Sequence, residues 1–462
     1  MLGFSYDRFF ARTGRRSLCL LLGIASASLP QLALAETPTP FVRSVRVPAS
    51  RIENTRTLSS LRLDLGRGIG PDEAALIATY QNLALRVERA RRGLARAQIV
   101  QAGVLPNPVV TYQRDDVTGG NTLGTQTAYN FSAGWEVTSL LPLLPRQTAA
   151  RANLRSVDLD IAWQEWRIAQ EARTAVYRVV ALEEELASAR QADRELSASA
   201  DTLKRAVEAH EKTVLDYGAA AASALDARAI ALGLEQEYEK QRLILKKTLG
   251  LEPTAEVRLR DGIGLPSHLD LPNEKMLNEN LENRRLDLIA LREGYRSQEA
   301  TVRAAFLSAF PKISIGFVKA TDTTNVQTEG FAITAEVPIF DRHQGVIATE
   351  RATRQKLLDE FHLRVFDARA SIAAALADLR SLNRQVAVAE EGLPVFERLV
   401  SAAETALQQG NTDVLFYYTA RSGLLQRRIH LIKLKEQLLE AKTALELASG
   451  RFLPSNAAMN LK

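Results

Sequence analysis

The sequence predicts a mainly α-helical protein with a smaller β portion, in which one plan is used twice. Residues 200 positions apart recur without a gap, and in each copy a stretch with an apolar period of two comes before long stretches with a helical period. A repeat of this length indicates a duplicated domain rather than a solenoid of short repeats. The matching residues are Val214 with Val414, Leu215 with Leu415, Tyr217 with Tyr417, and Gly250 with Gly450.

The first 35 residues have the pattern of a secretory signal. Basic residues at Arg12, Arg15 and Arg16 precede an apolar run at 18–29, and Ala33-Leu34-Ala35 provides a small-x-small cleavage site. The only cysteine, Cys19, lies in this segment and does not follow the small residues of a lipidation site. We therefore expect a mature chain without a lipid anchor, a disulfide or a cysteine metal ligand. No later apolar run of about 20 residues predicts a membrane-spanning helix.

Composition and periodicity divide the chain into six parts. Pro and acidic residues at 71–73 start a helix that is expected to run to about Val104. The expected parts are a signal peptide at 1–35, an extended segment at 36–70, a first repeat at 71–250 (helix, β-hairpin 108–137, long helix pair 151–250), a connector at 251–282, a second repeat at 283–450 (helix, β-hairpin 311–339, long helix pair 345–450), and a tail at 451–462.

The β-hairpins carry apolar residues on alternate positions, which predicts one apolar and one mostly polar face. Each strand spans about ten residues, the length of a tilted transmembrane β-strand. We expect six residues to face lipid, with the first and the third of them at the membrane interfaces. These are Tyr129, Phe131, Trp135, Phe317, Phe331 and Ile333. The alternative is that they pack in the core of a soluble sandwich.

The helices after each β-hairpin are too long for a globular core. The first would run for about 60 residues, which is near 90 Å at the helical rise per residue. Its apolar residues recur at coiled-coil spacing, and Gly250 or Gly450 would end the return helix. Four strands cannot close on themselves, and an open edge in lipid would cost several kcal/mol for each unpaired backbone group. We therefore expect several copies of the chain to pool their strands.

Three stretches together resemble the TolC-type outer-membrane efflux channel family over nearly the whole mature chain. They are residues 101–108 (QAGVLPNP), 337–342 (VPIFDR) and 410–415 (GNTDVL). The resemblance implies a homotrimer with a twelve-stranded barrel in the outer membrane of a Gram-negative bacterium and a helical tunnel on the order of 100 Å through the periplasm. It also implies a periplasmic adaptor (membrane fusion protein) and an inner-membrane pump of the RND type.

Within that family, residues 340–345 (FDRHQG) are similar to the Asp-Arg-Asn-Gln-Gly stretch of the CzcC-like heavy-metal branch, although His343 replaces the Asn. Heavy-metal cations are thus one expected substrate. Multidrug or organic solute efflux and type I protein secretion remain alternatives. A soluble periplasmic coiled-coil protein is a further alternative, but it would lack alternating lipid-facing strands.

No chemistry-bearing motif stands out. The five histidines, His210, His268, His343, His362 and His430, are scattered, and no cysteine or methionine cluster occurs. We expect no enzyme activity, no cofactor and no dedicated metal site. Any metal would pass as a hydrated ion. The net charge of +5 is modest and basic residues alternate with acidic ones, so nucleic acid is not an expected partner.

The turns between the paired helices lie farthest from the strands and are expected to meet the adaptor. The candidate contacts are His210, Lys212, Gly410, Asn411 and Thr412. In a trimer, Asp413 would form a ring of three carboxylates that attracts cations, and Asp216 is the alternative gate residue. Asp413 could instead only cap the returning helix.

Overall fold

The structure is a computed structural model that describes residues 68–120 and 123–453. All of them belong to one compact unit, residues 54–462. The expected signal peptide, most of the extended segment at 36–70, and most of the tail at 451–462 lie outside the described residues.

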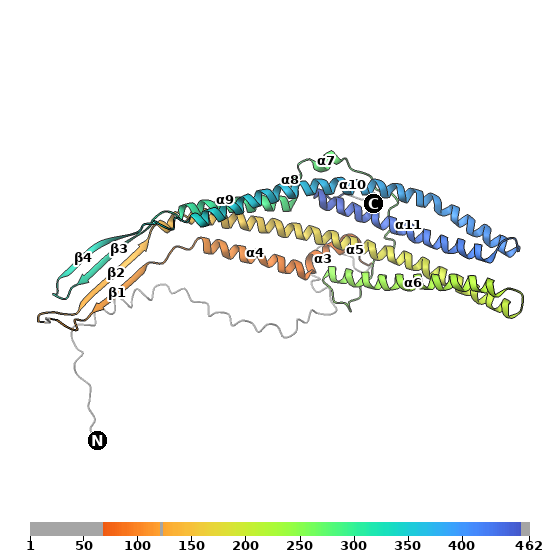
Figure 1. Cartoon of the computed structure of the whole chain (residues 1–462), viewed down its shortest axis with the longest axis horizontal. Coiled ribbons are helices and arrows are strands. Elements are labelled where there is room, and N and C mark those ends of the chain that lie inside the picture. Colours follow the sequence, from red (N-terminus) through yellow and green to blue (C-terminus); the bar gives the residue numbers. More distant parts are fainter. Residues whose placement is uncertain (1–67, 121–122, 454–462) are drawn as a thin grey trace, which may run out of the picture. The chain divides into compact units, whose positions relative to one another are not determined.

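Each repeat contributes helices, two strands and a long helical hairpin, as Figure 1 shows. The first repeat contains α3 (Pro71–Gln81), α4 (Leu83–Ala102), β1 (Val109–Asp115), β2 (Ala128–Glu136), the 3-10 turn η2 (Thr138–Leu140), α5 (Leu143–Glu208) and α6 (Val214–Leu249). The connector contains α7 (Glu274–Asn278), and α8 (Leu281–Arg284) lies at its boundary with the second repeat. The second repeat contains α9 (Leu286–Leu307), β3 (Lys312–Thr321), β4 (Gln327–Glu336), α10 (Gln344–Gln408) and α11 (Val414–Ser449).

The helix expected from Pro71 to Val104 is wrong in one respect, because it is broken at Asn82. The Asn82 side-chain oxygen accepts hydrogen bonds from the backbone N–H groups of Ala84 (2.9 Å) and Leu85 (3.3 Å). It thereby caps a new helix, α4, instead of continuing α3. Its amide nitrogen donates to the Thr248 carbonyl at 2.9 Å, which ties the break to the end of α6.

The first long helix is 66 residues and begins at Leu143, between two prolines. Pro142 is its N-cap and Pro145 lies in the first turn, where backbone N–H groups have no helical partner and proline is tolerated. Gly250 and Gly450 end the two return helices in the left-handed conformation, with φ of 75° and 62°. The same C-cap at matching positions supports the internal duplication.

The four strands form one antiparallel sheet in the order β1-β2-β3-β4. Strands β2 and β3 join the two repeats. Strands β1 and β4 each pair on one side only within the described residues, so the sheet has two free edges. The predicted fold class is confirmed for the single chain: duplicated long helical hairpins with four strands.

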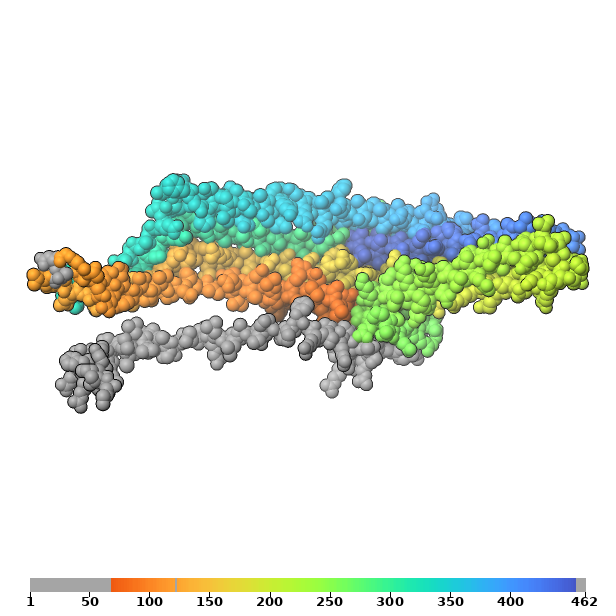
Figure 2. All heavy atoms as spheres, turned by 60° about the horizontal axis from the view of Figure 1, so that its bottom comes forward, coloured from red at the N-terminus to blue at the C-terminus, as the bar shows by residue number. Residues whose placement is uncertain are grey.

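The helical hairpins α5–α6 and α10–α11 extend to the end of the unit opposite the sheet (Figure 1). In the space-filling view of Figure 2, the surfaces of α6 and of the second hairpin reach the same end. Near that end the buried core is rich in alanine, which allows helices to approach closely. Its buried members are Ala189, Leu196, Ala200, Ala220, Ala224, Ala227, Ala231, Val400, Ala403, Val414, Tyr417, Tyr418 and Leu425.

Candidate functional site

The sheet register places all six candidate lipid-facing residues on one face. Phe317 lies opposite Phe331, and Ile315 lies opposite both Trp135 and Ile333. Directly opposed residues in an antiparallel sheet point to the same side, and every second residue of a strand does so too. Tyr129 and Phe131 are therefore on the face of Trp135.

This face is open to the surroundings in the single chain; it is apolar next to the helices and carries the ion pair of Lys319 with Glu329 (2.5 Å) toward the β3–β4 turn. The side chains of Phe331 and Ile333 are 93 % and 76 % exposed. The opposite face carries small and polar residues such as Thr111, Ser132 and Gly316. An apolar face with a polar reverse side is typical of a barrel strand between lipid and water. That these residues face lipid stays a prediction.

Two aromatic residues lie toward opposite ends of β2. The Trp135 indole N–H donates to the Pro106 carbonyl at 2.8 Å, which fixes the ring at the end next to the helices. Near the other end, Tyr129 stacks on Tyr112 with ring centroids 6.4 Å apart. Aromatic residues with a polar group prefer the two membrane interfaces, and this arrangement is compatible with that preference.

The first hairpin turn is shaped by a reciprocal cap. His210 takes a left-handed conformation (φ 63°), and Thr213 is the N-cap of α6. The Thr213 hydroxyl accepts from the Asp216 N–H at 3.1 Å, while an Asp216 carboxylate oxygen accepts from the Thr213 N–H at 3.0 Å. The backbone hydrogen bond from Thr213, and after it the one that the Thr213 hydroxyl donates to the carboxylate at 2.8 Å, lower the pKa of Asp216 and keep it ionised. The candidate contact residue Lys212 is exposed.

The second turn has a similar construction. Gly410 is left-handed (φ 74°), and Asp413 caps α11 by accepting from the Leu415 N–H at 3.2 Å. Both candidate gate carboxylates therefore cap helices. A cap leaves one or more carboxylate oxygens free, so it does not exclude a second role in a ring of charges. Asn411 is exposed and Thr412 is half-buried.

The structure adds residues that the sequence did not indicate, because they join helices more than 200 positions apart. Near the turns, Arg421 of α11 forms an ion pair with Glu195 of α5, and the Tyr418 and Ser199 hydroxyls are 2.5 Å apart. Arg421 also donates to the Tyr417 hydroxyl at 2.8 Å. These contacts hold one hairpin to the other beside the turns.

The same pairing continues along α5 and α11. The Thr174 and Thr443 hydroxyls are 3.4 Å apart, and Arg178 donates to Glu440 at 2.5 Å. We call the contact of α5 with α11 over residues 174–199 and 418–443 the inter-hairpin seam. Any movement of one hairpin relative to the other must break its polar contacts.

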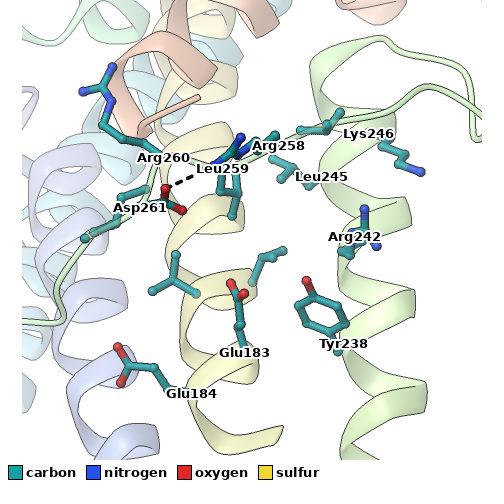
Figure 3. A pocket seen from close by; sticks show the side chains of 15 residues that line it. Glu183, Glu184, Tyr238, Arg242, Leu245, Lys246, Arg258, Leu259, Arg260 and Asp261 are labelled. Atoms are coloured by element: carbon teal, nitrogen blue, oxygen red, sulfur yellow. Dashed lines mark hydrogen bonds and ion pairs between the residues drawn. The ribbon is translucent and has the colours of Figure 1, made fainter. Parts of the chain in front are cut away.

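A cavity of about 530 Å³ lies between α5, α6 and the connector (Figure 3). Some of its charged residues are engaged within the chain: Arg258 pairs with Asp261 at 3.2 Å, and Lys246 donates to the Pro253 carbonyl at 2.8 Å. Tyr238 of α6 and Glu183 of α5 both project into the cavity (Figure 3). This arrangement does not pair a nucleophile with a general base.

Between Gly68 and Gly120 and between Leu123 and Leu453, no three His, Cys, Asp or Glu side chains are grouped so that they could hold a metal ion. None of the helices in these ranges is both long and apolar enough to cross a membrane.

These features are similar to those of known proteins. Residues 277–451 match the family model of outer membrane efflux proteins. The chain is 26 % identical over 454 residues to the cobalt-zinc-cadmium resistance protein CzcC of Cupriavidus metallidurans, covering 94 % of this chain and 100 % of that protein.

Solved structures share the fold. A membrane protein from Pseudomonas aeruginosa aligns with a TM-score of 0.72 and 20 % identity, over 84 % of this chain and 95 % of that one. CusC aligns with a TM-score of 0.67 and 18 % identity, over 83 % and 93 %. With its helical hairpins, its strands and these similarities, the chain is similar to outer membrane efflux proteins, and over most of its length it has the fold of solved channels such as CusC and OprN.

Proposed function

We propose that this channel is the outer membrane component of a tripartite efflux system that exports heavy-metal cations. The observation that carries the proposal is the placement of an open apolar sheet face at one end of the unit and two capped helix turns at the other (Figure 1). Such a chain can conduct from the periplasm to the exterior without supplying energy. An inner-membrane pump of the RND type and a periplasmic adaptor would supply drive and connection.

The working form is proposed to be a homotrimer. Strands β1 and β4 leave two free edges, and backbone groups in lipid must be paired. Three copies would close a barrel of twelve strands. The helices also expose apolar residues at heptad spacing, with Leu225 and Leu232 on α6 65 % and 60 % exposed. On α10, Leu363 and Phe366 are exposed as well, and a neighbouring copy would cover both stripes.

Adaptor contact is assigned to the helix turns, through His210, Lys212, Gly410, Asn411 and Thr412. All of them except the half-buried Thr412 are exposed, and the turns lie at the end away from the sheet. The gate is assigned to Asp413, with Asp216 as the alternative. A threefold ring of either carboxylate would attract cations within about 8–10 Å.

Metal cations are proposed as the substrate because the similarity to a cobalt-zinc-cadmium resistance protein extends over nearly the whole chain. We propose that the cations pass in hydrated form, without a dedicated group of metal ligands in the channel. Type I protein secretion and organic solute efflux use the same architecture. The class of substrate therefore has to be determined by an experiment on living cells.

The test is a deletion strain exposed to cobalt, zinc and cadmium salts and to a panel of organic drugs. The proposal is supported if the deletion strain is sensitive to the metal salts and the intact gene restores its resistance. Sensitivity to drugs alone would contradict metal export and indicate organic solutes as the substrate. A secretion defect without metal sensitivity would indicate proteins as the substrate. Complementation with an Asp413→Ala, Asp216→Ala double variant tests whether the gate carboxylates matter for metal export.

A further inference from the structure

Glu185 lies in the middle of the inter-hairpin seam and is an unusual residue for that place. It is 1 % exposed, and neither carboxylate oxygen has a hydrogen-bond partner. The seam register places it opposite Lys433, because Arg178 faces Glu440 and Glu195 faces Arg421 along the antiparallel helices. A buried carboxylate without partners is costly when it is ionised.

Apolar residues of α5 flank Glu185, since Leu182 and Leu186 are 8 % and 4 % exposed. The buried residues Leu431 and Leu434 of α11 pack against Val386 of α10. The apolar clusters that include α5 lie farther toward the turns or farther toward α3. An ionised Glu185 would lie next to these apolar side chains without a hydrogen-bond partner, so its charge state affects whether α5 and α11 stay together here.

Acidic and basic groups surround Glu185 from both neighbouring helices. Glu436 of α11 is 16 % exposed and lies 3.7 Å from Arg178, which itself is 2.5 Å from Glu440. The further charged and titratable groups around this part of the seam are Lys433 and Lys435 on α11, Glu237 and Tyr238 on α6, and Glu183 and Glu184 on α5 itself.

Burial raises the pKa of Glu185 to about 7, with Lys433 opposing and Glu436 adding to the rise. Burial likewise raises the pKa of Glu436 to about 7, and the neighbouring Glu440 adds to it. A folded-state pKa above the usual value means that the closed seam binds protons more readily than an open, hydrated one. The closed seam is therefore most stable below the usual carboxyl pKa and loses this stability as the pH rises through about 7.

We propose that Glu185 is a proton-binding site that controls the inter-hairpin seam: the seam is closed when Glu185 is protonated and loosens when it is ionised. An ionised Glu185 has two ways to relieve its burial. It can take a proton from water, or α5 and α11 can separate so that water reaches the carboxylate. Because α5 and α11 belong to one chain, assembly with other copies does not expose the residue.

The size of the effect follows from linkage. A pKa difference between 4.5 and about 7 can change the ratio of closed to open seam by at most roughly 300-fold between acidic and alkaline limits. Over the narrower range from pH 6 to pH 8, Glu185 would go from about nine-tenths to about one-tenth protonated. Proton binding at Glu185 does not depend on the proposed channel function. Its consequence, pH control of the passage through the channel, does rest on that function.

The experiment measures the seam directly in the full mature protein, purified as its oligomer in detergent. Spin labels on introduced cysteines at the exposed positions Ala187 and Gln437 report the distance between α5 and α11 at pH 5.5 and pH 8.5. The single native cysteine, Cys19, precedes the expected start of the mature chain. We expect a short, narrow distance distribution at pH 5.5 and a longer, broader one at pH 8.5, with a midpoint near pH 7.

Two variants separate proton binding from general loosening. Glu185→Gln should keep the short distance at both pH values, whereas the control Glu183→Gln, an exposed neighbour, should behave like the unmodified protein. Lys433→Ala should shift the midpoint to higher pH, because the cation that favours the ionised form is lost. If Glu185→Gln does not assemble, the shift of the midpoint in Lys433→Ala still tests the proposal.

Infrared difference spectra between pH 6 and pH 8 provide an independent reading. A protonated carboxyl band that disappears at pH 8 and is missing in Glu185→Gln supports the assignment. A pH-dependent widening that persists in Glu185→Gln, or a distance that does not change with pH in the unmodified protein, overturns it. None of these readings depends on which cargo the channel carries, so a negative metal-sensitivity test leaves them interpretable.

Discussion

An arginine in place of Ile333 separates a lipid-facing sheet from a water-exposed one. The side chain is 76 % exposed in the single chain and lies opposite Ile315 on the apolar face. On a water-exposed surface such a substitution changes the free energy of unfolding by at most about 0.5 kcal/mol. Against lipid near the bilayer midplane, the same arginine costs about 2–4 kcal/mol.

A lipid-facing and a water-exposed position of Ile333 predict very different equilibrium constants for assembly. A cost of 2–4 kcal/mol lowers the equilibrium constant for insertion by roughly 30- to 700-fold, at about 1.4 kcal/mol for each tenfold change. Thr334 is the next residue in β4 and points to the opposite, polar face. Thr334→Arg is thus a matched control with the same strand, the same depth and the same added charge.

The assay compares the amount of heat-modifiable oligomer in outer membrane fractions, followed by denaturant-dependent folding into lipid vesicles. We expect Ile333→Arg to lose most of the assembled form and Thr334→Arg to retain it. Equal assembly of Ile333→Arg and the unmodified protein would refute the lipid-facing assignment of this face. A loss of assembly in both variants would instead indicate that any arginine in β4 is disruptive.

Three further predictions concern the helix turns and the seam. Removing Arg421 (Arg421→Ala) breaks the ion pair with Glu195, costs the closed seam about 1 kcal/mol and should raise the open probability in planar bilayers, whereas Arg428→Ala, which loses a pair with Glu397 inside the second hairpin, should not. Asp413→Ala should lower cation selectivity and the block by multivalent cations in single-channel records; unchanged selectivity in both this variant and Asp216→Ala, with a loss of helix stability of about 1 kcal/mol, would leave Asp413 as a cap only. A cysteine at Asn411 should crosslink to a co-expressed adaptor, and crosslinks that arise only from positions near Gly120 would contradict the placement of the adaptor at the turns.

Periodicity in the sequence was sufficient to predict the type of each large element. Apolar residues alternate along Ala128–Glu136 and along Gln327–Glu336 from Phe331 onward, and because a strand has only two faces, these residues lie on one face, as predicted. The glycine C-caps were also predictable, since Gly250 and Gly450 follow long helical patterns and adopt positive φ. Local chemistry determines both features, and local chemistry is visible in one sequence.

Other boundaries depended on competition between local signals. Asn82 interrupts a stretch with helical composition because its side chain satisfies two backbone N–H groups and reaches Thr248, which is 166 positions away. Pro394 lies inside α10, yet the helix continues through it. A proline removes one backbone donor, and packing along a long helix can outweigh that loss.

By itself, then, the sequence determined the duplication, the paired long helices, the two β-hairpins with their apolar faces, and the resemblance to an efflux channel family. Only the tertiary structure decided which helices meet and in which register. Arg421 and Glu195 are 226 positions apart, and Glu185 becomes a buried carboxylate only because α11 lies against α5 at that level. Helical periodicity specifies which side of a helix is buried but not which partner buries it, because many apolar stripes are mutually compatible. The pairing of charges across the inter-hairpin seam is a property of the assembled hairpins, and the residues that would control movement in this channel are found there.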